Sequence, residues 1–439
     1  MGDLSDKVAT VIDLGNYQEL AIRLARDFGK VNFFKPWKRS APSYHSLVIG
    51  QGFDEINRVR NLFDVVNETD IFIFPDVYDA DLQLHLERLG KRVWGSRRAE
   101  EFEFNRGLFK RTLKEVGLPV PEYVEIQGMT ALREFLEDHA DEEWFIKRHL
   151  LRGDGETCAA ENIELSRAIL GQMDAYYGGL KELFKFIVEK KVEAAIEVAY
   201  DGICVDGQFT DGFVGCEAKN RAYIAAFTAY QDMNEHVRTV NEAFAPKLKE
   251  CRMRSMWGTE IRVSEDGKPY FIDATCRMPS PPGELMLEMI GNLSEIIWHG
   301  SVGEFVQAEP VKPFGVEVMV YADWEDASTL PMQVPDKVRQ WFKFDSCCKV
   351  GNTYHSIQFG GDEHYPWIRS QVAEIVAIGD SVEEAIELAK GYADELIGLN
   401  CEVTIEALAD ALKDIRAGEK EGVEFSANDI PDPSTILED

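Results

Sequence analysis

The first hundred residues alternate short apolar runs with stretches of helical spacing. Apolar residues recur at helical spacing in Tyr17–Phe28 and Leu82–Leu89, which predicts two helices. Strands are predicted over the apolar runs Val8–Leu14, Val31–Phe34, Ile71–Phe74 and Arg92–Trp94, each closed by a nearby Gly or Pro. Strands separated by helices predict an α/β unit with a parallel, doubly wound sheet.

The middle of the chain adds a helix and several strands. Phe104–Val116 is predicted to be a helix that ends at Gly117, and its basic residues Arg106, Lys110 and Lys114 recur every four positions on one face. Phe145–Lys147 and Phe186–Val188 are short apolar strands, and Ile196–Val205 is a longer one. Trp257–Val263 and Tyr270–Ala274 are predicted to pair antiparallel across the turn Glu265–Lys268.

Composition changes near Pro310, which separates a C-terminal part of the chain. A strand at Val372–Ile378 is followed by a helix at Ser381–Ile397 with Asp380 or Ser381 as its cap, which predicts an α+β domain. At ~150 residues per domain, 439 residues predict about three domains. We place them at residues 1–97, 98–309 and 310–430, followed by an acidic tail at 431–439.

Charge and cysteine usage narrow the classes of function. The chain has 47 Lys and Arg against 78 Asp and Glu, a net charge of −31, which makes nucleic acid and anionic membranes poor partners. Its eight cysteines include no C-x-x-C pair, so neither a zinc ribbon nor a redox motif is indicated. No signal peptide or bilayer-length apolar run is present, and we expect a cytoplasmic protein.

A series of short motifs between residues 94 and 284 resembles the ATP-grasp superfamily, in particular the branch of glycinamide ribonucleotide synthetase and biotin carboxylase. The resemblance lies in their order: Val93-Trp94-Gly95-Ser96, Asn105-Arg106 with Lys110, Gly117-Leu118-Pro119-Val120-Pro121, Phe145-Ile146-Lys147, Val188-Glu189-Lys190-Lys191-Val192 with Glu197, then Glu260 and Tyr270–Arg277. It implies a parallel-sheet domain, a two-lobed ATP-grasp domain with a lid at about 118–188, and a C-terminal α+β domain.

The resemblance also implies which residues bind ATP. The phosphates would be held by Arg106, Lys110, Lys147 and a loop containing Gly153 and Gly155, the adenine by Glu189, Lys191 and Val192, and the ribose by Glu197. Other readings stay open for several of them. The alternatives are a solvated helix face for the basic residues, an ordinary hairpin turn for the two glycines, and a solvated strand position for Glu197.

A magnesium site is implied at Glu260 and Asp273, on the two strands predicted to pair. Mg²⁺ takes one or two carboxylates together with phosphate oxygens. The family usually has Glu at the second position and Asn two residues later, where this chain has Asp273 and Thr275. A polar cross-strand face without metal is the alternative. Arg277 matches an arginine that holds a phosphate or carboxylate, and with Lys147 it is the expected catalytic cation.

We therefore expect an ATP-dependent ligase that joins a small carboxylate to an amine through an acyl phosphate, releasing ADP and phosphate. A phosphotransferase acting on a hydroxyl, or a nucleotide-binding assembly protein without turnover, are the alternatives, and a homodimer stays open. Glycinamide ribonucleotide synthetases carry an Arg-containing phosphate loop after the first strand, where this chain has Gly15-Asn16-Tyr17-Gln18-Glu19. We expect Glu19 to disfavour a sugar-phosphate acceptor there.

Overall fold

A five-stranded parallel sheet forms the N-terminal part of the protein. The structure is a computed structural model that describes residues 3–13, 15–35, 48–149, 157–160, 163–193, 196–322, 331–356, 370–425 and 430–436. The strand order is β3-β2-β1-β4-β5, with helices α1 (Gln18–Leu24) and α2 (Ala80–Arg88) between strands. The strands are β1 (Val8–Ile12), β2 (Lys30–Phe34), β3 (Asn57–Val59), β4 (Ile71–Ile73) and β5 (Arg92–Trp94). The predicted parallel sheet is therefore confirmed.

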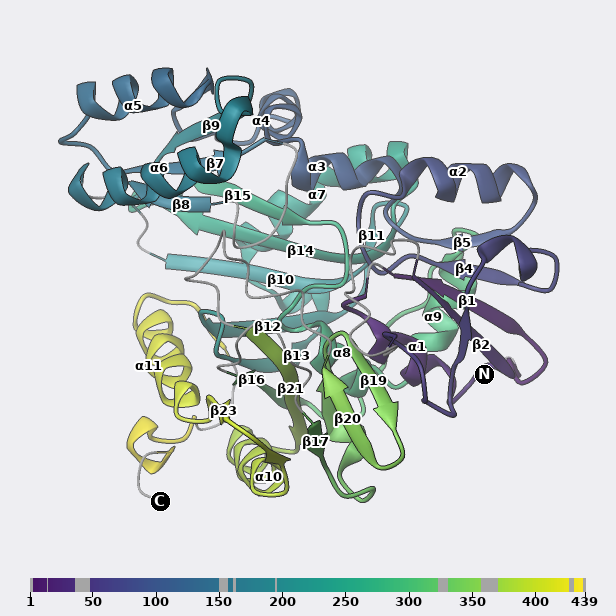
Figure 1. Ribbon diagram of the computed structural model, residues 1–439. Helices are drawn as coiled ribbons and strands as arrows, with labels where there is room; N and C mark the ends of the chain where they lie inside the picture. Colours follow the sequence, from purple (N-terminus) through teal and green to yellow (C-terminus); the bar gives the residue numbers. More distant parts are fainter. Residues whose placement is uncertain are drawn as a thin grey trace.

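A second, four-stranded sheet lies at the upper left of Figure 1, in the segment expected to form a lid, and we call this unit the lid. Its strand order is β6-β9-β7-β8, and helices α5 (Met129–Asp138) and α6 (Ile163–Tyr177) accompany it. The strands are β6 (Tyr123–Gln127), β7 (Trp144–Arg148), β8 (Thr157–Ala160) and β9 (Lys185–Lys190). Leu132 and Leu136 of α5 are buried with Trp144 and Val188, so the lid has a small apolar core of its own.

The largest sheet runs through the middle of the protein and continues past residue 310. Its order is β15-β14-β10-β12-β13-β16-β21-β18, with β11 beside β10 and β23 beside β16. The strands are β10 (Ile196–Val205), β11 (Gln208–Phe209), β12 (Gly212–Ala218), β13 (Ala222–Thr228), β14 (Arg254–Val263), β15 (Pro269–Thr275), β16 (Phe314–Ala322), β18 (Phe342–Phe344), β21 (Ser370–Gly379) and β23 (Cys401–Val403). The expected C-terminal domain thus shares a sheet with the segment before it, through the pairing of β13 with β16.

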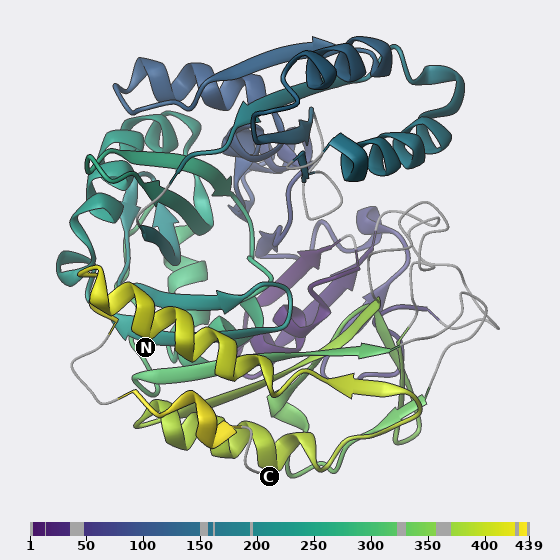
Figure 2. The same cartoon turned by 90° about the vertical axis from the view of Figure 1, so that its left-hand side faces the viewer.

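Helices flank the large sheet, and α7 presents an apolar stripe to it. In α7 (Glu235–Cys251) the buried residues Val237, Val240, Phe244 and Leu248 recur at three- and four-residue spacing and pack against Trp257. The other helices are α3 (Glu101–Phe104), α4 (Arg106–Glu115), α8 (Gly283–Met289), α9 (Leu293–Gly300), α10 (Val382–Ala393) and α11 (Ala407–Lys420). Figure 2 shows α11 crossing in front of this sheet, below the lid.

The C-terminal segment contains a further small sheet and a packed end. β19 (Cys347–Val350), β20 (Thr353–Ser356), β17 (Pro331–Gln333) and β22 (Ile397–Gly398) form the sheet. The helix expected to reach Ile397 ends at Ala393, and Ser381 caps its start by accepting from the Glu384 amide. Pro433 and Ile436, in the segment expected to be a tail, are buried in a short 3₁₀ turn against α11. None of the helices in the described segments is long and apolar enough to cross a membrane.

Four acidic side chains meet in the core where α8 lies against the large sheet. Glu284 of α8, Glu317 of β16, Asp345 of the β18–β19 turn and Glu374 of β21 interact with one another. One oxygen each of Glu284, Glu317 and Glu374 is buried and accepts no hydrogen bond from the residues that the structure describes. Burial and the neighbouring carboxylates raise the pKa of Glu317 to about 8 and that of Asp345 to about 7. At a pH between the ordinary carboxyl pKa and these raised values, the folded protein therefore keeps protons in this cluster that the unfolded chain has released.

The acid cluster predicts that stability falls as pH rises. Because the folded-state pKa values are raised, the free energy of unfolding should be highest near the ordinary carboxyl pKa of ~4 and decrease until pH ~8. Glu317→Gln keeps the acceptor for the Leu285 amide, a bond of 2.9 Å, and cannot ionise. Urea unfolding should show this variant more stable than wild type by about 1–3 kcal/mol at pH 8 and nearly equal at pH 5. A pH-independent difference would contradict the shared-proton account.

Candidate active site between the lid and the large sheet

A cavity of about 1520 Å³ lies between the lid, the large sheet and α11. Eight residues expected from the sequence line it: Arg106, Lys147, Glu189, Val192, Glu197, Glu260, Asp273 and Arg277. Two expected residues lie just outside it. Lys110 is buried behind Glu189, and the Lys191 side chain pairs with Glu143 at 2.6 Å. Gly153 and Gly155 lie outside the described residues.

Cations from the lid and from the core converge on Asp273. Arg106, at the start of α4, forms an ion pair with Asp273, whose second oxygen accepts from Lys147 Nζ of β7 at 2.9 Å. Although burial alone would raise it, the charges of Arg106 and Lys147 hold the pKa of Asp273 well below its usual value. Asp273 therefore stays ionised and joins the lid to the large sheet.

A second buried ion pair lies next to the first. Glu189 of β9 pairs with Lys110 of α4 and lies 3.5 Å from Lys147. Burial lowers the pKa of Lys110 against the opposing effect of Glu189. Neither side chain is more than 3% exposed, so this contact fixes β9, the last strand of the lid, against α4.

Glu260 and Asp273 face each other across β14 and β15, as the predicted pairing required. They are direct partners in the strand register, on the cavity floor. Burial of the carboxyl and the charge of Asp273 raise the pKa of Glu260 to about 8, although its side chain opens onto the cavity. In the described part of the chain Glu260 has no ion-pair partner, and no three His, Cys, Asp or Glu side chains are grouped to hold a metal. A cation bound between the two carboxylates would balance the charge on Glu260.

Arg277 closes the end of the cavity nearest the N-terminal sheet. Its Nε donates to Glu103 at 2.8 Å, and Nη1 donates to Tyr17 Oη at 2.9 Å. The charge of Glu103 keeps the pKa of Arg277 well above its ordinary value despite burial, so the guanidinium is permanently charged. The site thereby joins the parallel sheet to the large sheet.

The expected effect of Glu19 on a sugar phosphate is wrong. Glu19 does not face the loop after β1, because it accepts from Arg339 Nη2 at 2.8 Å and is buried. A cation lies there instead, since a Cβ placed on Gly15 would come within 2.3 Å of Lys35 Nζ. Burial and Asp76 raise the pKa of the neighbouring Asp13 to about 6. The sequence alone did not show which charges meet at this loop.

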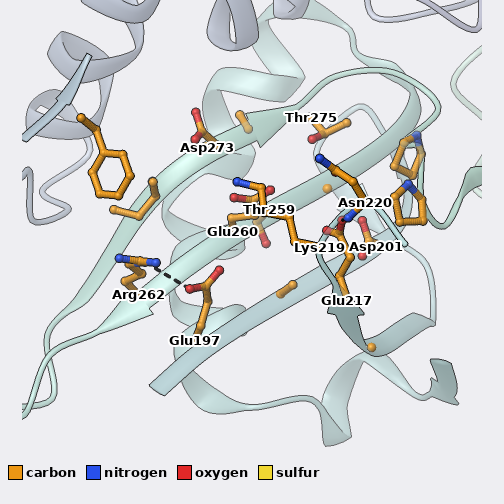
Figure 3. A pocket seen from close by; sticks show the side chains of 18 of the residues that line it. Glu197, Asp201, Glu217, Lys219, Asn220, Thr259, Glu260, Arg262, Asp273 and Thr275 are labelled. Carbon is orange, nitrogen blue, oxygen red and sulfur yellow. Dashed lines mark hydrogen bonds and ion pairs between the residues drawn. The ribbon is translucent and has the colours of Figure 1, made fainter. Parts of the chain in front are cut away.

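Several cavity residues were not identified from the sequence. Lys219 and Asn220 extend into the cavity from the β12–β13 turn, and Glu217 precedes them (Figure 3). Asp201 lies on β10, and Asp414 and Glu421 belong to the α11 end of the wall. No spacing motif marks them, because strands and a helix that are distant in sequence bring them together. The same figure shows Glu197 paired with Arg262, at 3.1 Å.

Comparison with known proteins defines the fold. No family model matches the chain, and no curated protein matches its sequence. Among solved structures, phosphoribosylamine–glycine ligase from Thermotoga maritima superposes with a TM-score of 0.68 at 14% identity, covering 90% of this chain and 98% of that one. The biotin carboxylase domain of 2-oxoglutarate carboxylase from Hydrogenobacter thermophilus gives 0.63 at 14% identity, over 96% and 99%.

An L-amino acid ligase from Bacillus licheniformis is also similar, with a TM-score of 0.58 at 14% identity over 90% of this chain and 99% of that one. These structures are ATP-grasp ligases. At this level of identity the similarity establishes the fold: the chain has the ATP-grasp fold, as the sequence motifs predicted.

The Asp273 ion pairs predict a large effect of a small substitution on stability. Asp273→Asn preserves the shape of the side chain but leaves Arg106 and Lys147 with one carboxylate fewer in a buried site. We expect the free energy of unfolding to fall by about 2–4 kcal/mol, measured by urea denaturation. Asp266→Asn, on the exposed turn of the same hairpin, is the control and should change it by less than about 0.5 kcal/mol. Equal stabilities of the two variants would show that Asp273 does not hold the lid.

Proposed function

We propose that this chain is an ATP-dependent carboxylate–amine ligase that forms an amide through an acyl phosphate and releases ADP and phosphate. The observation that carries the proposal is the convergence of Arg106 and Lys147 with Glu260 and Asp273 at one cavity between the lid and the large sheet. Lys110 is buried behind them, paired with Glu189. Phosphoryl transfer needs this combination, with cations for the phosphates and carboxylates for a metal. Ligases that use small substrates are among the proteins that share the fold.

The nucleotide would lie along the connection between β9 and β10. Val192 lines the cavity there and offers an apolar contact to a base, while Lys191 is directed to Glu143 and contributes only its backbone. Glu197 lies on the same face of the sheet as Glu260, in the neighbouring row, where it is opposite Arg262. Its carboxylate would accept hydrogen bonds from ribose hydroxyls.

Mg²⁺ fits the pair Glu260 and Asp273. Two carboxylates are the number this ion usually takes from a protein when phosphate oxygens complete its coordination. Burial and the charge of Asp273 raise the pKa of Glu260, and no described cation forms an ion pair with it, which supports a bound cation at this position. Bound there, the ion would supply positive charge beside the phosphates of ATP.

The protein's own cations would stabilise the phosphoryl transfer. Lys147 is held at Asp273 by a 2.9 Å contact, so its ammonium is positioned before substrate binds and would contact the transferred phosphoryl group. Arg277 is fixed by Glu103 and Tyr17, and it would hold the substrate carboxylate that attacks the phosphoryl group. Closure of the lid would then exclude water from the acyl phosphate.

Trapping with hydroxylamine tests this function. Purified protein, magnesium–ATP and a panel of amino acids and small carboxylates are screened for ADP release, and hydroxylamine is added to capture an acyl phosphate as a hydroxamate. We expect one class of carboxylate to yield ADP and hydroxamate together. ADP with a phosphorylated hydroxyl and no hydroxamate would establish a phosphotransferase, and no ADP with any substrate would leave a nucleotide-binding protein.

Lys147→Ala should suppress both products together, by about a hundredfold or more, because the lysine acts in the step that makes both. The control is Lys191→Ala, whose side chain contacts Glu143 outside the cavity, and it should stay within about twofold of wild type. A loss of hydroxamate with normal ADP release in Lys147→Ala would place this lysine after phosphoryl transfer and contradict its assigned role.

A further inference from the structure

Asp201 lies on the same face of the large sheet as the carboxylate pair Glu260 and Asp273. In the β10–β14 register Asp201 is opposite Gly258, and Ala199 is opposite Glu260. In the β14–β15 register Gly258 is opposite Thr275, and Glu260 is opposite Asp273. Residues two apart on a strand point to the same side and are about 7 Å apart. Asp201, Gly258 and Thr275 therefore form the next row of the cavity floor.

The middle of this row has no side chain. A Cβ added to Gly258 would lie 2.9 Å from Asp201 Oδ1 and 3.2 Å from Thr275 Cβ. Asp201, Gly258 and Thr275 all line the cavity. Figure 3 shows Asp201 and Thr275 toward the same end of it, with Asn220 beside them. Because residue 258 is a glycine, the Asp201 carboxylate can lie across the middle of the row, close to the Thr275 side chain.

Tyr223 fixes the Asp201 carboxylate. Its hydroxyl donates to Asp201 Oδ2 at 2.9 Å, and it crosses Gly215, where a Cβ would come within 2.0 Å of the hydroxyl oxygen. Asp201 is half-buried, and no described cation forms an ion pair with it. Burial and the charge of Glu217 raise the pKa of Asp201 to about 7, against the effect of the Tyr223 hydrogen bond. An anchored, unneutralised carboxylate of this kind suits a substrate cation.

We infer that the row Asp201–Gly258–Thr275 is the subsite for the amine, and that Asp201 binds the ammonium form of this substrate and accepts its proton. This inference rests on the proposed function. The chemistry requires such a group, because most primary amines are protonated at neutral pH and an ammonium has no lone pair with which to attack. The subsite lies one row, about 7 Å, from the carboxylates assigned to magnesium and hence next to the acyl phosphate.

Amide formation from the ammonium form of the substrate begins with the loss of a proton. One ammonium proton passes to Asp201, and the freed nitrogen lone pair attacks the acyl carbon, forming the C–N bond. The C–O bond to phosphate breaks, and the phosphate leaves with that electron pair. The second proton of the nitrogen goes to the departing phosphate, and Asp201 returns its proton to water. The products are a neutral amide and hydrogen phosphate.

Two nucleophiles that differ in charge test the inference. Methylamine is almost entirely protonated at pH 7.5 and needs a base, whereas hydroxylamine is mostly uncharged and does not. Using a carboxylate that gives hydroxamate with wild type, Asp201→Asn should form methylamide at least about a hundredfold more slowly. Its hydroxamate formation and ADP release should stay within about threefold of wild type. Asp266→Asn, outside the cavity on the β14–β15 turn, is the matched control and should match wild type with both nucleophiles.

Tyr223→Phe is a second variant that leaves Asp201 in place. Loss of the donor should raise the pKa of Asp201, so the acidic limb of the methylamide pH–rate profile should move to higher pH. The charged and titratable groups that face Asp201 in the cavity are Glu217, Lys219, Glu260 and Asp273. Their effect is common to wild type and variant. A merely structural role for Tyr223 would lower both reactions without moving the profile.

The outcomes separate this subsite from the proposed function. If wild type forms no hydroxamate with any carboxylate, the ligase function fails. If wild type forms hydroxamate but no methylamide, or if Asp201→Asn makes methylamide as fast as wild type, the ligase stands and the amine subsite is refuted. An equal loss of both products in a folded Asp201→Asn, checked by its thermal midpoint, would likewise refute it, since the residue would then act before the amine.

Discussion

The carboxylate of Asp273 lies between two buried cations, one on core helix α4 and one on lid strand β7. Without it Arg106 and Lys147 would be charged, buried and close together, which costs several kcal/mol. Glu189 extends the same arrangement to Lys110, so that buried ion pairs fix the lid on the large sheet. Phosphates entering this network would contact the same cations, and the carboxylates would be released to hold a metal.

The strand register of the large sheet determines the relative positions of the site residues. The register across β10, β14 and β15 places Glu197 in one row on one face of the sheet. Glu260 and Asp273 are in the next row, and Asp201 and Thr275 in the row after that. The spacing between rows separates the expected ribose, metal and amine positions. Helix α11 packs against β12 and β13 of the same sheet and forms the opposite wall of the cavity.

Local sequence patterns predicted many of the helices and strands, the fold, and the site residues that lie in motifs. Apolar runs closed by Gly or Pro located β1, β2, β4 and β5, and the Asp-Gly turn located the β14–β15 hairpin that pairs Glu260 with Asp273. Ion pairs between residues that are distant in sequence could not be predicted from local motifs. Glu19 pairs with Arg339, 320 residues later, so a local reading of the loop after β1 gave it the wrong role. Asp201 has no motif, and its position depends on the register with Gly258 and on Tyr223 reaching over Gly215.

Oxygen transfer tests the central claim most directly, that the cavity phosphorylates a substrate carboxylate. The carboxylate identified by screening is labelled with ¹⁸O in both oxygens, and the released phosphate is examined by mass spectrometry. Formation and breakdown of an acyl phosphate predicts one ¹⁸O atom in each phosphate, because the C–O bond is broken by the amine. Release of phosphate without label, at the same rate as ADP, would contradict it.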